Sequence, residues 1–452
     1  MPVLHRPGGG QLVERGEPGA AGGCQEGIGH RLTVGSAVVL ANPGVVLTDH
    51  VVTVPLDHAD PGGGTIEVFA REVVAADRRR DDLPWLLFLQ GGPGVPAPRP
   101  YTQDVWLRRA LRTHRVLLLD QRGTGRSTPL TARTVQGLDD AEIARRVRLM
   151  RADSIVRDAE VLRERVAGGR PWDTLGQSYG GFITLTYLSI APQGLRTCFI
   201  TGGLPGLDAT ADDVCARTYP RVAAKNAAYY RAYPQDAAVL RKLADRLDAE
   251  DVRLPDGDRL TARRLRMLGV NFGMSSGFAR VHWLLEEAGS DSFGYAVMAE
   301  TGFIDRPLFA LQEYSVAGPG RATGWAADRL LRDHPAFAAD ADPLLFTGEM
   351  MYPWMFREIA ALRPFAGVAD LLAAADDWPA LYDPARLAAN EVPVVAAVYH
   401  DDMYVNVELS LRTAAEVGNL RTWVTSEYEH DGLRVAGDHV LGRLMDMAAG
   451  LA

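Results

Sequence analysis

Segment 176–181 reads Gly-Gln-Ser-Tyr-Gly-Gly and holds Ser178 between glycines, directly after a strand-like stretch and before a helix-like one. This is the pattern of a nucleophile elbow, a turn so tight that the nucleophile adopts strained backbone angles. Side chains at Gly176 or Gly180 would collide with neighbouring backbone, and glycine avoids the collision. The turn would lift the serine hydroxyl clear of a sheet, above a helix N-terminus that favours negative charge. The pattern predicts nucleophilic catalysis, although Gly-x-Ser-x-Gly also occurs in ordinary turns.

A serine nucleophile needs a general base and a carboxylate that orients the base, and the α/β-hydrolase order is serine, acid, histidine. Downstream of Ser178, an apolar strand-like run ends in a loop with Asp401 and Asp402, where an acid would face the same sheet edge. The last strand-like run is followed by a loop with His430. Of the ten histidines, His430 has the best position for the base, because His400 would share a loop with its own orienting acid. Position alone leaves two candidate acids.

Two glycine-containing loops follow earlier apolar runs. The run 85–89 leads into 90–94 (Gln-Gly-Gly-Pro-Gly), whose backbone N–H groups could stabilise an oxyanion, although a plain Gly-Pro turn is the alternative. The next run leads into 120–127 (Asp-Gln-Arg-Gly-Thr-Gly-Arg-Ser), which lacks the glycine and lysine spacing of a phosphate loop. We expect Asp120 and Arg122 to form an ion pair that braces this second loop.

The elements around these residues alternate between strands and helices. Alternating patterns over 49–55 and 65–71 indicate a hairpin, and uniformly apolar runs separated by helix-like stretches such as 139–166 indicate a parallel sheet. Between about 207 and 390 the residues are mostly Ala, Arg, Leu and Asp at helical spacing. We therefore predict an α/β-hydrolase fold. Its mostly parallel central sheet would have helices on both faces and a large helical cap inserted before the acid and histidine strands.

Length and composition indicate an ordinary globular protein with an insertion. The chain has 452 residues, of which 47% are hydrophobic and 23% charged, and its formal charge of -9 argues against nucleic-acid binding. The expected domains are a disordered leader over 1–34, a hydrolase core over 35–206 and 391–452, and a cap over 207–390.

The number of cysteines, the length of the apolar runs and the composition of the N-terminal residues indicate which cofactors, membranes and compartments to expect. Three cysteines are too few and too scattered for a disulfide framework or a metal cluster. No run approaches the roughly 18 apolar residues of a membrane span. The Gly-rich N-terminal residues lack the basic and apolar order of a secretory signal, so we expect a cytoplasmic protein without membrane partners.

With these residues in hand, the chain resembles the prolyl aminopeptidase (proline iminopeptidase) family of serine peptidases in the α/β-hydrolase superfamily. It is most similar to the longer-chain branch of that family, from about residue 35 to the C-terminus. The matching segments are 54–58 (Val-Pro-Leu-Asp-His), 83–94, 120–127, 176–181, 402–405 (Asp-Met-Tyr-Val) and 427–430 (Glu-Tyr-Glu-His).

The resemblance implies a role for each site residue. Ser178 would be the nucleophile and His430 the general base, with Asp402 as the orienting acid because the family's acid precedes the Met-Tyr pair. Gly92 and Tyr179 would donate the backbone N–H groups of the oxyanion hole. The implied substrates are short peptides with a free N-terminal proline or a similar small residue, and no metal or cofactor is implied.

An aminopeptidase must also recognise a protonated amine, which calls for carboxylates under the cap. Glu313 fits this demand and resembles the family's lid segment, while Glu286 and Glu287 are weaker candidates. Each could instead be a solvated acid on a helix face. Asp431 stands where close relatives would have an amide, and a carboxylate beside His430 is expected to raise the pKa of the imidazole.

Two alternatives remain open from the sequence. The same fold and triad could serve an esterase or a tripeptidyl-type aminopeptidase, because a fold does not set the substrate. A binding protein without catalytic activity would require a lost triad member, and none is lost here. The preferred N-terminal residue is also open, as is assembly into a homo-oligomer.

Overall fold

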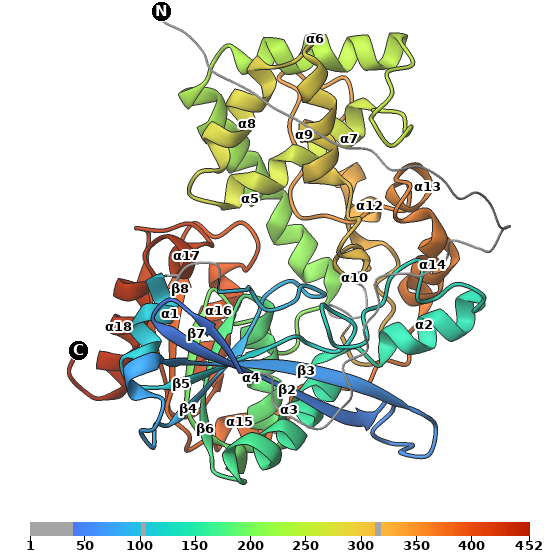
Figure 1. The fold of residues 1–452 in the computed structure, drawn as a ribbon. Helices are drawn as coiled ribbons and strands as arrows, with labels where there is room; N and C mark the ends of the chain where they lie inside the picture. The colour runs from blue at the N-terminus through green and yellow to red at the C-terminus, as the bar shows by residue number, and fades with distance from the viewer. Residues whose placement is uncertain (1–38, 101–104, 312–317) are drawn as a thin grey trace, which may run out of the picture. The chain divides into compact units, whose positions relative to one another are not determined.

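The computed structural model describes residues 39–100, 105–311 and 318–452. They form a nine-stranded sheet with the order β1-β2-β3-β5-β4-β6-β7-β8-β9 (Figure 1). Pairing is antiparallel from β1 to β5 and parallel from β5 to β9, so the expected hairpin and the mostly parallel sheet are both confirmed. The strands are β1 (Val39–Asn42), β2 (Val45–Pro55), β3 (Thr65–Ala75), β4 (Trp85–Leu89), β5 (Arg115–Leu119), β6 (Trp172–Gln177), β7 (Leu195–Thr201), β8 (Val394–Tyr399) and β9 (Leu420–Thr425).

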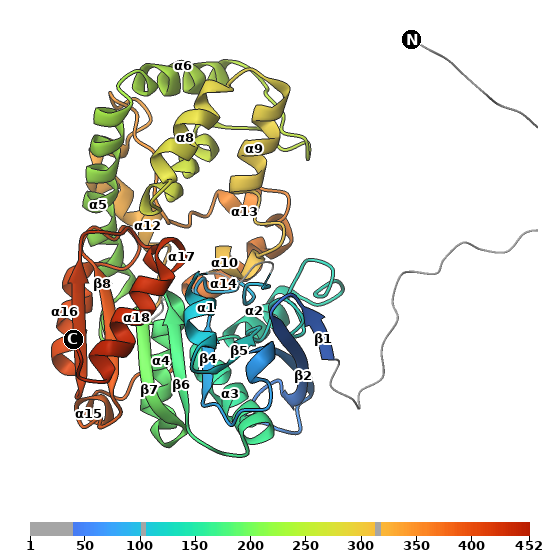
Figure 2. The same cartoon turned by 60° about the vertical axis from the view of Figure 1, so that its left-hand side comes forward.

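Helices cover both faces of this sheet, which explains its uniformly apolar central strands. Along β4, Leu87 and Leu89 pack into one hydrophobic cluster, whereas Leu86 and Phe88 pack into another on the opposite face. Helix α3 (Ala152–Ala167) packs on α4 (Tyr179–Ile190) at the first face, and α1 (Val105–Leu111) packs on α18 (Gly437–Ala448) at the second (Figure 2). Every residue of β4 is therefore buried.

The predicted helix over 139–166 is two helices. Helix α2 (Asp140–Arg148) begins after Asp139, whose side chain accepts a hydrogen bond from the Glu142 N–H, and α3 begins after Arg151 in extended conformation. Met150, between them, is buried in the core. Amphipathic spacing continues across this short break, so it did not predict the interruption.

The predicted ion pair between Asp120 and Arg122 is wrong. Asp120 pairs with Arg99 at 2.6 Å, and Arg122 pairs with Asp158 of α3 at 2.6 Å. Both charges are almost fully buried, so each needs its own set of partners. Those partners come from segments distant in the sequence, and spacing within one loop could not identify them.

A helical insertion separates β7 from β8, as the sequence predicts. The described part of this stretch contains one isolated β-bridge and no strand of the sheet. Its helices are α5 (Ala211–Ala232), α6 (Asp236–Ala249), α7 (Ala262–Arg266), α8 (Gly277–Glu286), α9 (Asp291–Thr301), α10 (Pro307–Ala310), α12 (Ala326–Leu330), α13 (Met355–Glu358), α14 (Ala366–Ala374) and α15 (Pro384–Ala388). Helices α16 (Val407–Glu416) and α17 (Gly432–Val435) then complete the C-terminal part.

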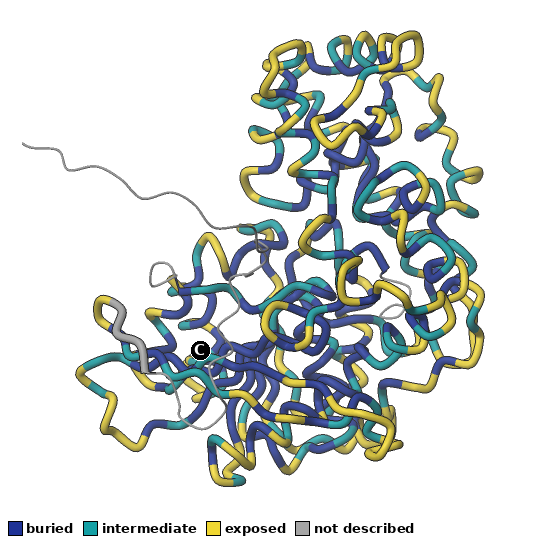
Figure 3. The backbone as a smooth tube through the Cα atoms, turned by 45° about the vertical axis from the view of Figure 1, so that its right-hand side comes forward, coloured by how far each residue is buried: buried dark blue, intermediate teal, exposed yellow. Residues whose placement is uncertain are grey.

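The insertion shares its hydrophobic core with the sheet. One continuous cluster runs from strand residues such as Leu87 to insertion residues such as Tyr229 and Phe346. Buried segments can be followed through both parts in Figure 3. Residues 38–452 accordingly form one compact unit, and the predicted boundaries at 207 and 390 stay a prediction. No helix in the described ranges has the length and apolar character needed to span a membrane.

Candidate active site

The turn between β6 and α4 has the geometry of a nucleophile elbow. Ser178 has φ 54° and ψ -123°, a backbone conformation that residues other than glycine rarely adopt. A Cβ atom at Gly176 would collide with the carbonyl group of Gly180, and a Cβ at Gly180 would collide with the carbonyl oxygen of Leu89 in β4. The two glycines therefore allow the turn to pack against the sheet, as the sequence predicts.

The loops after β8 and β9 bring a histidine and a carboxylate together. The Nδ1 atom of His430 lies 2.6 Å from Oδ2 of Asp402, and the two side chains are only 5% and 1% exposed. The other oxygen of Asp402 accepts hydrogen bonds from the N–H groups of Tyr404 (2.8 Å) and Val405 (3.1 Å). Asp401 is 46% exposed and points elsewhere. Of the two candidate acids, only Asp402 can orient the His430 ring.

Backbone contacts fix His430 near the elbow. The N–H of His430 donates to the carbonyl oxygen of Gly273, in the insertion, at 3.0 Å. A Cβ at Gly202 would lie 3.1 Å from Nδ1 of His430, so this glycine lets the chain after β7 pass beside the ring. Within the described residues no hydrogen bond joins Ser178 to His430, whose Nε2 is 3.4 Å from Nε2 of Gln177. Catalytic hydrogen bonds are often long in the absence of substrate.

The surroundings of His430 raise its pKa above 6.5. Burial is the largest single influence, and it lowers the pKa. The charge and hydrogen bond of Asp402, together with the charges of Glu349 and Asp431, raise the pKa by more than burial lowers it. The carboxylate of Asp431 accepts hydrogen bonds from the N–H and, at 2.6 Å, from the hydroxyl of Ser275. Asp431 thus acts in the direction expected from the sequence, and Asp402 contributes more.

Two backbone segments lie next to the nucleophile. Gly92 has φ 140°, and a Cβ at the preceding Gly91 would lie 2.8 Å from the Cβ of Ser178. Tyr179 is the first residue of α4, where the backbone N–H has no acceptor within the helix. Gly92 and Tyr179 line the same cavity as Ser178, and their role as oxyanion donors stays a prediction.

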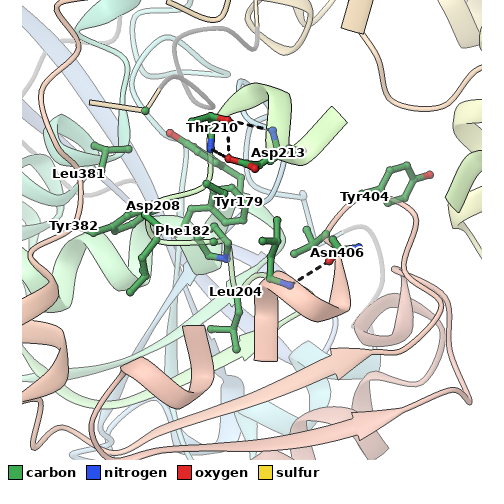
Figure 4. A pocket seen from close by; sticks show the side chains of 18 of the residues that line it. Tyr179, Phe182, Leu204, Asp208, Thr210, Asp213, Leu381, Tyr382, Tyr404 and Asn406 are labelled. Carbon is green, nitrogen blue, oxygen red and sulfur yellow. Dashed lines mark hydrogen bonds between the residues drawn. The ribbon is translucent and has the colours of Figure 1, made fainter. Parts of the chain in front are cut away.

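The cavity beside Ser178 has a volume of about 560 Å³ and lies between the sheet edge and the insertion (Figure 4). Among the described residues, three carboxylate side chains line it: Asp208, Asp213 and Glu349. Asp213 completes the capping box of α5 by accepting a 3.0 Å hydrogen bond from the backbone N–H of Thr210, and Asp208 pairs with Arg412. Within the part of the chain that the structure describes, no three His, Cys, Asp or Glu side chains are arranged to hold a metal ion.

Sequence comparisons assign the chain that carries this site to a known family. Residues 84–257 match the family model described as the α/β hydrolase fold. The proline iminopeptidase of Aeromonas sobria is 46% identical over 409 residues, which cover 89% of this chain and 96% of that protein. The chain belongs to the proline iminopeptidase family. A proline iminopeptidase of Aspergillus aculeatus is 34% identical over 409 residues, covering 86% and 91% of the two chains.

Solved structures are similar at lower identity. The proline iminopeptidase-related protein of Thermus thermophilus is 17% identical with a TM-score of 0.40, over 89% of this chain and 98% of that one. A putative lipase of Acinetobacter baumannii is 12% identical with a TM-score of 0.41, over 89% and 92%. The assignment to the proline iminopeptidase family rests on the two sequence relatives. The protein is therefore a prolyl aminopeptidase-like hydrolase of the α/β-hydrolase fold.

The carboxylates that the sequence suggested for substrate recognition differ from those in the cavity. Glu313 lies outside the described residues. Glu286 and Glu287 are exposed at the C-terminal end of α8 and do not line the cavity. Glu349 was missed. Its signal was one carboxylate within the otherwise uncharged segment 344–352, most of which is buried.

Proposed function

We propose that the protein is a serine aminopeptidase that releases an N-terminal proline, or a similar small residue, from short peptides. The observation that carries the proposal is the buried pair of His430 and Asp402, 2.6 Å apart, beside the elbow that presents Ser178. The two sequence relatives named proline iminopeptidase support the choice of substrate.

The mechanism follows from the positions of these side chains. Nε2 of His430 takes the proton of the Ser178 hydroxyl as its oxygen attacks the first peptide carbonyl. The backbone N–H groups of Gly92 and Tyr179 stabilise the oxyanion. His430 then protonates the leaving nitrogen, and the peptide shortened by one residue departs. Water, deprotonated by His430, hydrolyses the ester on Ser178 and regenerates the free hydroxyl.

Asp402 assists these reaction steps by fixing one tautomer of the His430 ring. Its carboxylate accepts the Nδ1–H of His430, which leaves Nε2 as the basic nitrogen available to deprotonate the nucleophile. The charge of Asp402 also stabilises the imidazolium that forms during each proton transfer.

Within this proposal, Glu349 binds the protonated N-terminal amine of the substrate. It lines the cavity with Ser178, and its charge acts on His430 and on Tyr404. Replacing Glu349 with Gln should raise KM for free-amine substrates about tenfold or more, because a charged hydrogen bond is lost. Glu313 stays a sequence-based prediction for the same role.

Chromogenic amides of proline, alanine and N-acetylproline test the function directly. Cleavage of the prolyl amide but not of the blocked amide is the expected result, because the site must recognise a free amine. Equal cleavage of the blocked amide would reject the aminopeptidase in favour of a different hydrolase, such as an esterase. Preference for a tripeptidyl amide would indicate a tripeptidyl-type enzyme.

The nucleophile has its own control in the same assay. Ser178→Ala removes the attacking oxygen without adding bulk to the elbow, so kcat should fall by a factor on the order of 10⁶ while the fold is kept. Circular dichroism verifies the fold, and near-normal turnover by the folded variant would reject Ser178.

We also propose that the enzyme works in the cytoplasm. Cys198 in β7 is a free buried thiol, and burial raises its pKa to about 12. Free thiols are typical of reducing compartments. Fractionation of cells that express the full chain tests this proposal, and recovery of the activity outside the cytoplasm would contradict it.

A further inference from the structure

A second, smaller cavity lies next to the catalytic base. Its volume is about 90 Å³, and Gln90, Gln177 and His430 are among the residues that line it. His430 is absent from the described residues that line the large cavity, whereas Ser178 is one of them. The base therefore adjoins the small cavity, and the nucleophile adjoins the large one.

The walls of the small cavity are large side chains from well-packed elements. Phe88 comes from β4, Trp106 from α1 and Leu433 from α17, and the insertion contributes Met274. The rings of Phe88 and Trp106 are stacked, with their centroids 4.4 Å apart. Helix α1 also packs on α17 (Figure 2). The cavity is therefore bounded by the folded core and by the insertion.

Polar side chains at this cavity can bind water. Gln90 and Gln177 are only half-buried, and the side-chain amide of Gln90 has no hydrogen-bond partner among the described residues. The carboxylate of Asp431 also lines the cavity, and its oxygens keep lone pairs beyond the bonds that they accept from Ser275. A water molecule needs about two to four polar partners and roughly 10–15 Å³ of such space, and the cavity provides both.

The basic nitrogen of His430 is within reach of a water molecule bound there. Because Asp402 accepts the Nδ1–H, the free lone pair of the ring is on Nε2. The amide nitrogen of Gln177 lies 3.4 Å from this Nε2, which is a long and therefore weak hydrogen bond. A water molecule beside Gln177 can displace this contact and donate its own proton to Nε2.

The amide of Gln177 is also close to the nucleophile. A Cβ atom at Gly91 would lie 2.5 Å from Oε1 of Gln177 and 2.8 Å from the Cβ of Ser178. The two side chains thus border the same glycine. Water held by Gln177 is therefore beside the ester that forms on Ser178.

We propose that the small cavity binds the water molecule that hydrolyses the acyl-enzyme. This inference rests on the aminopeptidase function proposed above. The water oxygen bonds to the carbonyl carbon of the prolyl ester while Nε2 of His430 takes one proton of the water. The bond between this carbon and the Ser178 oxygen then breaks, the proton passes from His430 to that oxygen, and free proline leaves.

Separate cavities give water and peptides different routes to the ester. The shortened peptide, or another amine, reaches the ester through the large cavity, whose volume of about 560 Å³ takes small ligands. Water from the small cavity attacks without first displacing that peptide. The arrangement therefore favours hydrolysis over transfer of the prolyl group to an amine.

Partition of the acyl-enzyme between water and an added amine tests this inference. The enzyme cleaves a chromogenic prolyl amide in the presence of phenylalaninamide, an amine larger than the small cavity. Initial rates of formation of proline and of prolyl-phenylalaninamide give the ratio of hydrolysis to transfer. Both products arise from one acyl-enzyme, so this ratio does not depend on the acylation rate or on how much of a variant is folded.

Two variants alter the small cavity in different ways. Gln90→Leu removes a hydrogen-bonding amide at similar size and should lower the ratio roughly three- to tenfold, the value of one hydrogen bond. Met274→Trp adds bulk to the same cavity and should also lower the ratio. Gln193→Leu is the matched control and should keep the wild-type ratio, because Gln193 is exposed and is not among the described residues that line either cavity.

Failure of the inference and failure of the proposed function give different results. An unchanged ratio in both Gln90→Leu and Met274→Trp, or an equal fall in Gln193→Leu, would overturn the inference alone. A wild-type enzyme that releases no chromophore from the prolyl amide would overturn the aminopeptidase function as well.

Discussion

At the residue scale, the site depends on which of two neighbouring carboxylates faces the base. Asp402 uses both of its oxygens, one for the His430 ring and one for two backbone N–H groups. Asp401 is exposed and lies 3.3 Å from Arg221 on α5. Adjacent aspartates of the same chemistry therefore have different surroundings, and only one of them is built into the site.

Replacing Asp402 with Asn should lower kcat by about 10⁴, because the amide favours the wrong imidazole tautomer while the geometry is kept. Asp401→Asn is the matched control, and its turnover should stay within a few-fold of wild type. Steady-state kinetics with a prolyl amide measures both. Loss of activity in Asp401→Asn with normal turnover in Asp402→Asn would reverse the assignment.

The pH profile tests the carboxylate beside the base. Catalysis requires neutral His430, and its pKa is raised, so the acidic limb of kcat/KM should lie above pH 6.5. Asp431→Asn removes a negative charge that stabilises the imidazolium, so the limb should move to lower pH. Asp438→Asn, which alters an exposed carboxylate on α18, should not move it. A shift of the limb to higher pH in Asp431→Asn would contradict this account.

At the scale of elements, α5 connects the cavity to the catalytic loops. Its first turns contribute Asp213 and Val214 to the cavity wall. Farther along, Lys225 makes hydrogen bonds of 2.6 and 2.5 Å to both oxygens of Glu429, the residue before His430. The chain has only two lysines, Lys225 and Lys242, among its 48 lysine and arginine residues. The insertion thereby stabilises the loop that carries the base.

Lys225→Met should reduce the free energy of unfolding by roughly 2 kcal/mol, between the values for exposed and buried ion pairs, because Glu429 loses its partner in a partly buried place. Chemical denaturation measures the loss. A double variant that also carries Glu429→Gln should be less destabilised than the two single changes added together. Arg246→Met, which breaks an exposed pair with Glu250 on α6, should have an effect near zero. Strict additivity at Lys225 and Glu429 would show that the pair is not coupled.

At the scale of the whole molecule, residues 38–452 form one compact unit with a continuous hydrophobic cluster. We expect sheet and insertion to unfold together in a single calorimetric transition, because neither can keep its buried surface without the other. The active-site inhibitor phenylmethylsulfonyl fluoride, added to samples held at each temperature, measures how much of Ser178 can still be labelled as the protein is heated. Two separated transitions, with the first abolishing labelling, would show that the insertion unfolds on its own.

Sequence patterns predicted the elements best where their cause is local. The apolar runs 85–89 and 116–119 lie in β4 and β5, since strands buried on both faces need apolar residues at successive positions. The break between α2 and α3 was missed because Met150 and Arg151 leave the helix to meet distant parts of the chain. The Asp120 and Arg122 pair failed for the same reason.

The amino-acid sequence by itself determined the elbow at Ser178, because the turn has its own glycine pattern and a Cβ at Gly176 would collide with Gly180 within the same turn. It also determined the order of the strands that carry the acid and the histidine. Only the tertiary structure decided that Asp402 faces His430 and that Glu349 lines the cavity. The physical reason is that the energy of a charge depends on burial and on partners from distant segments, which no local pattern encodes.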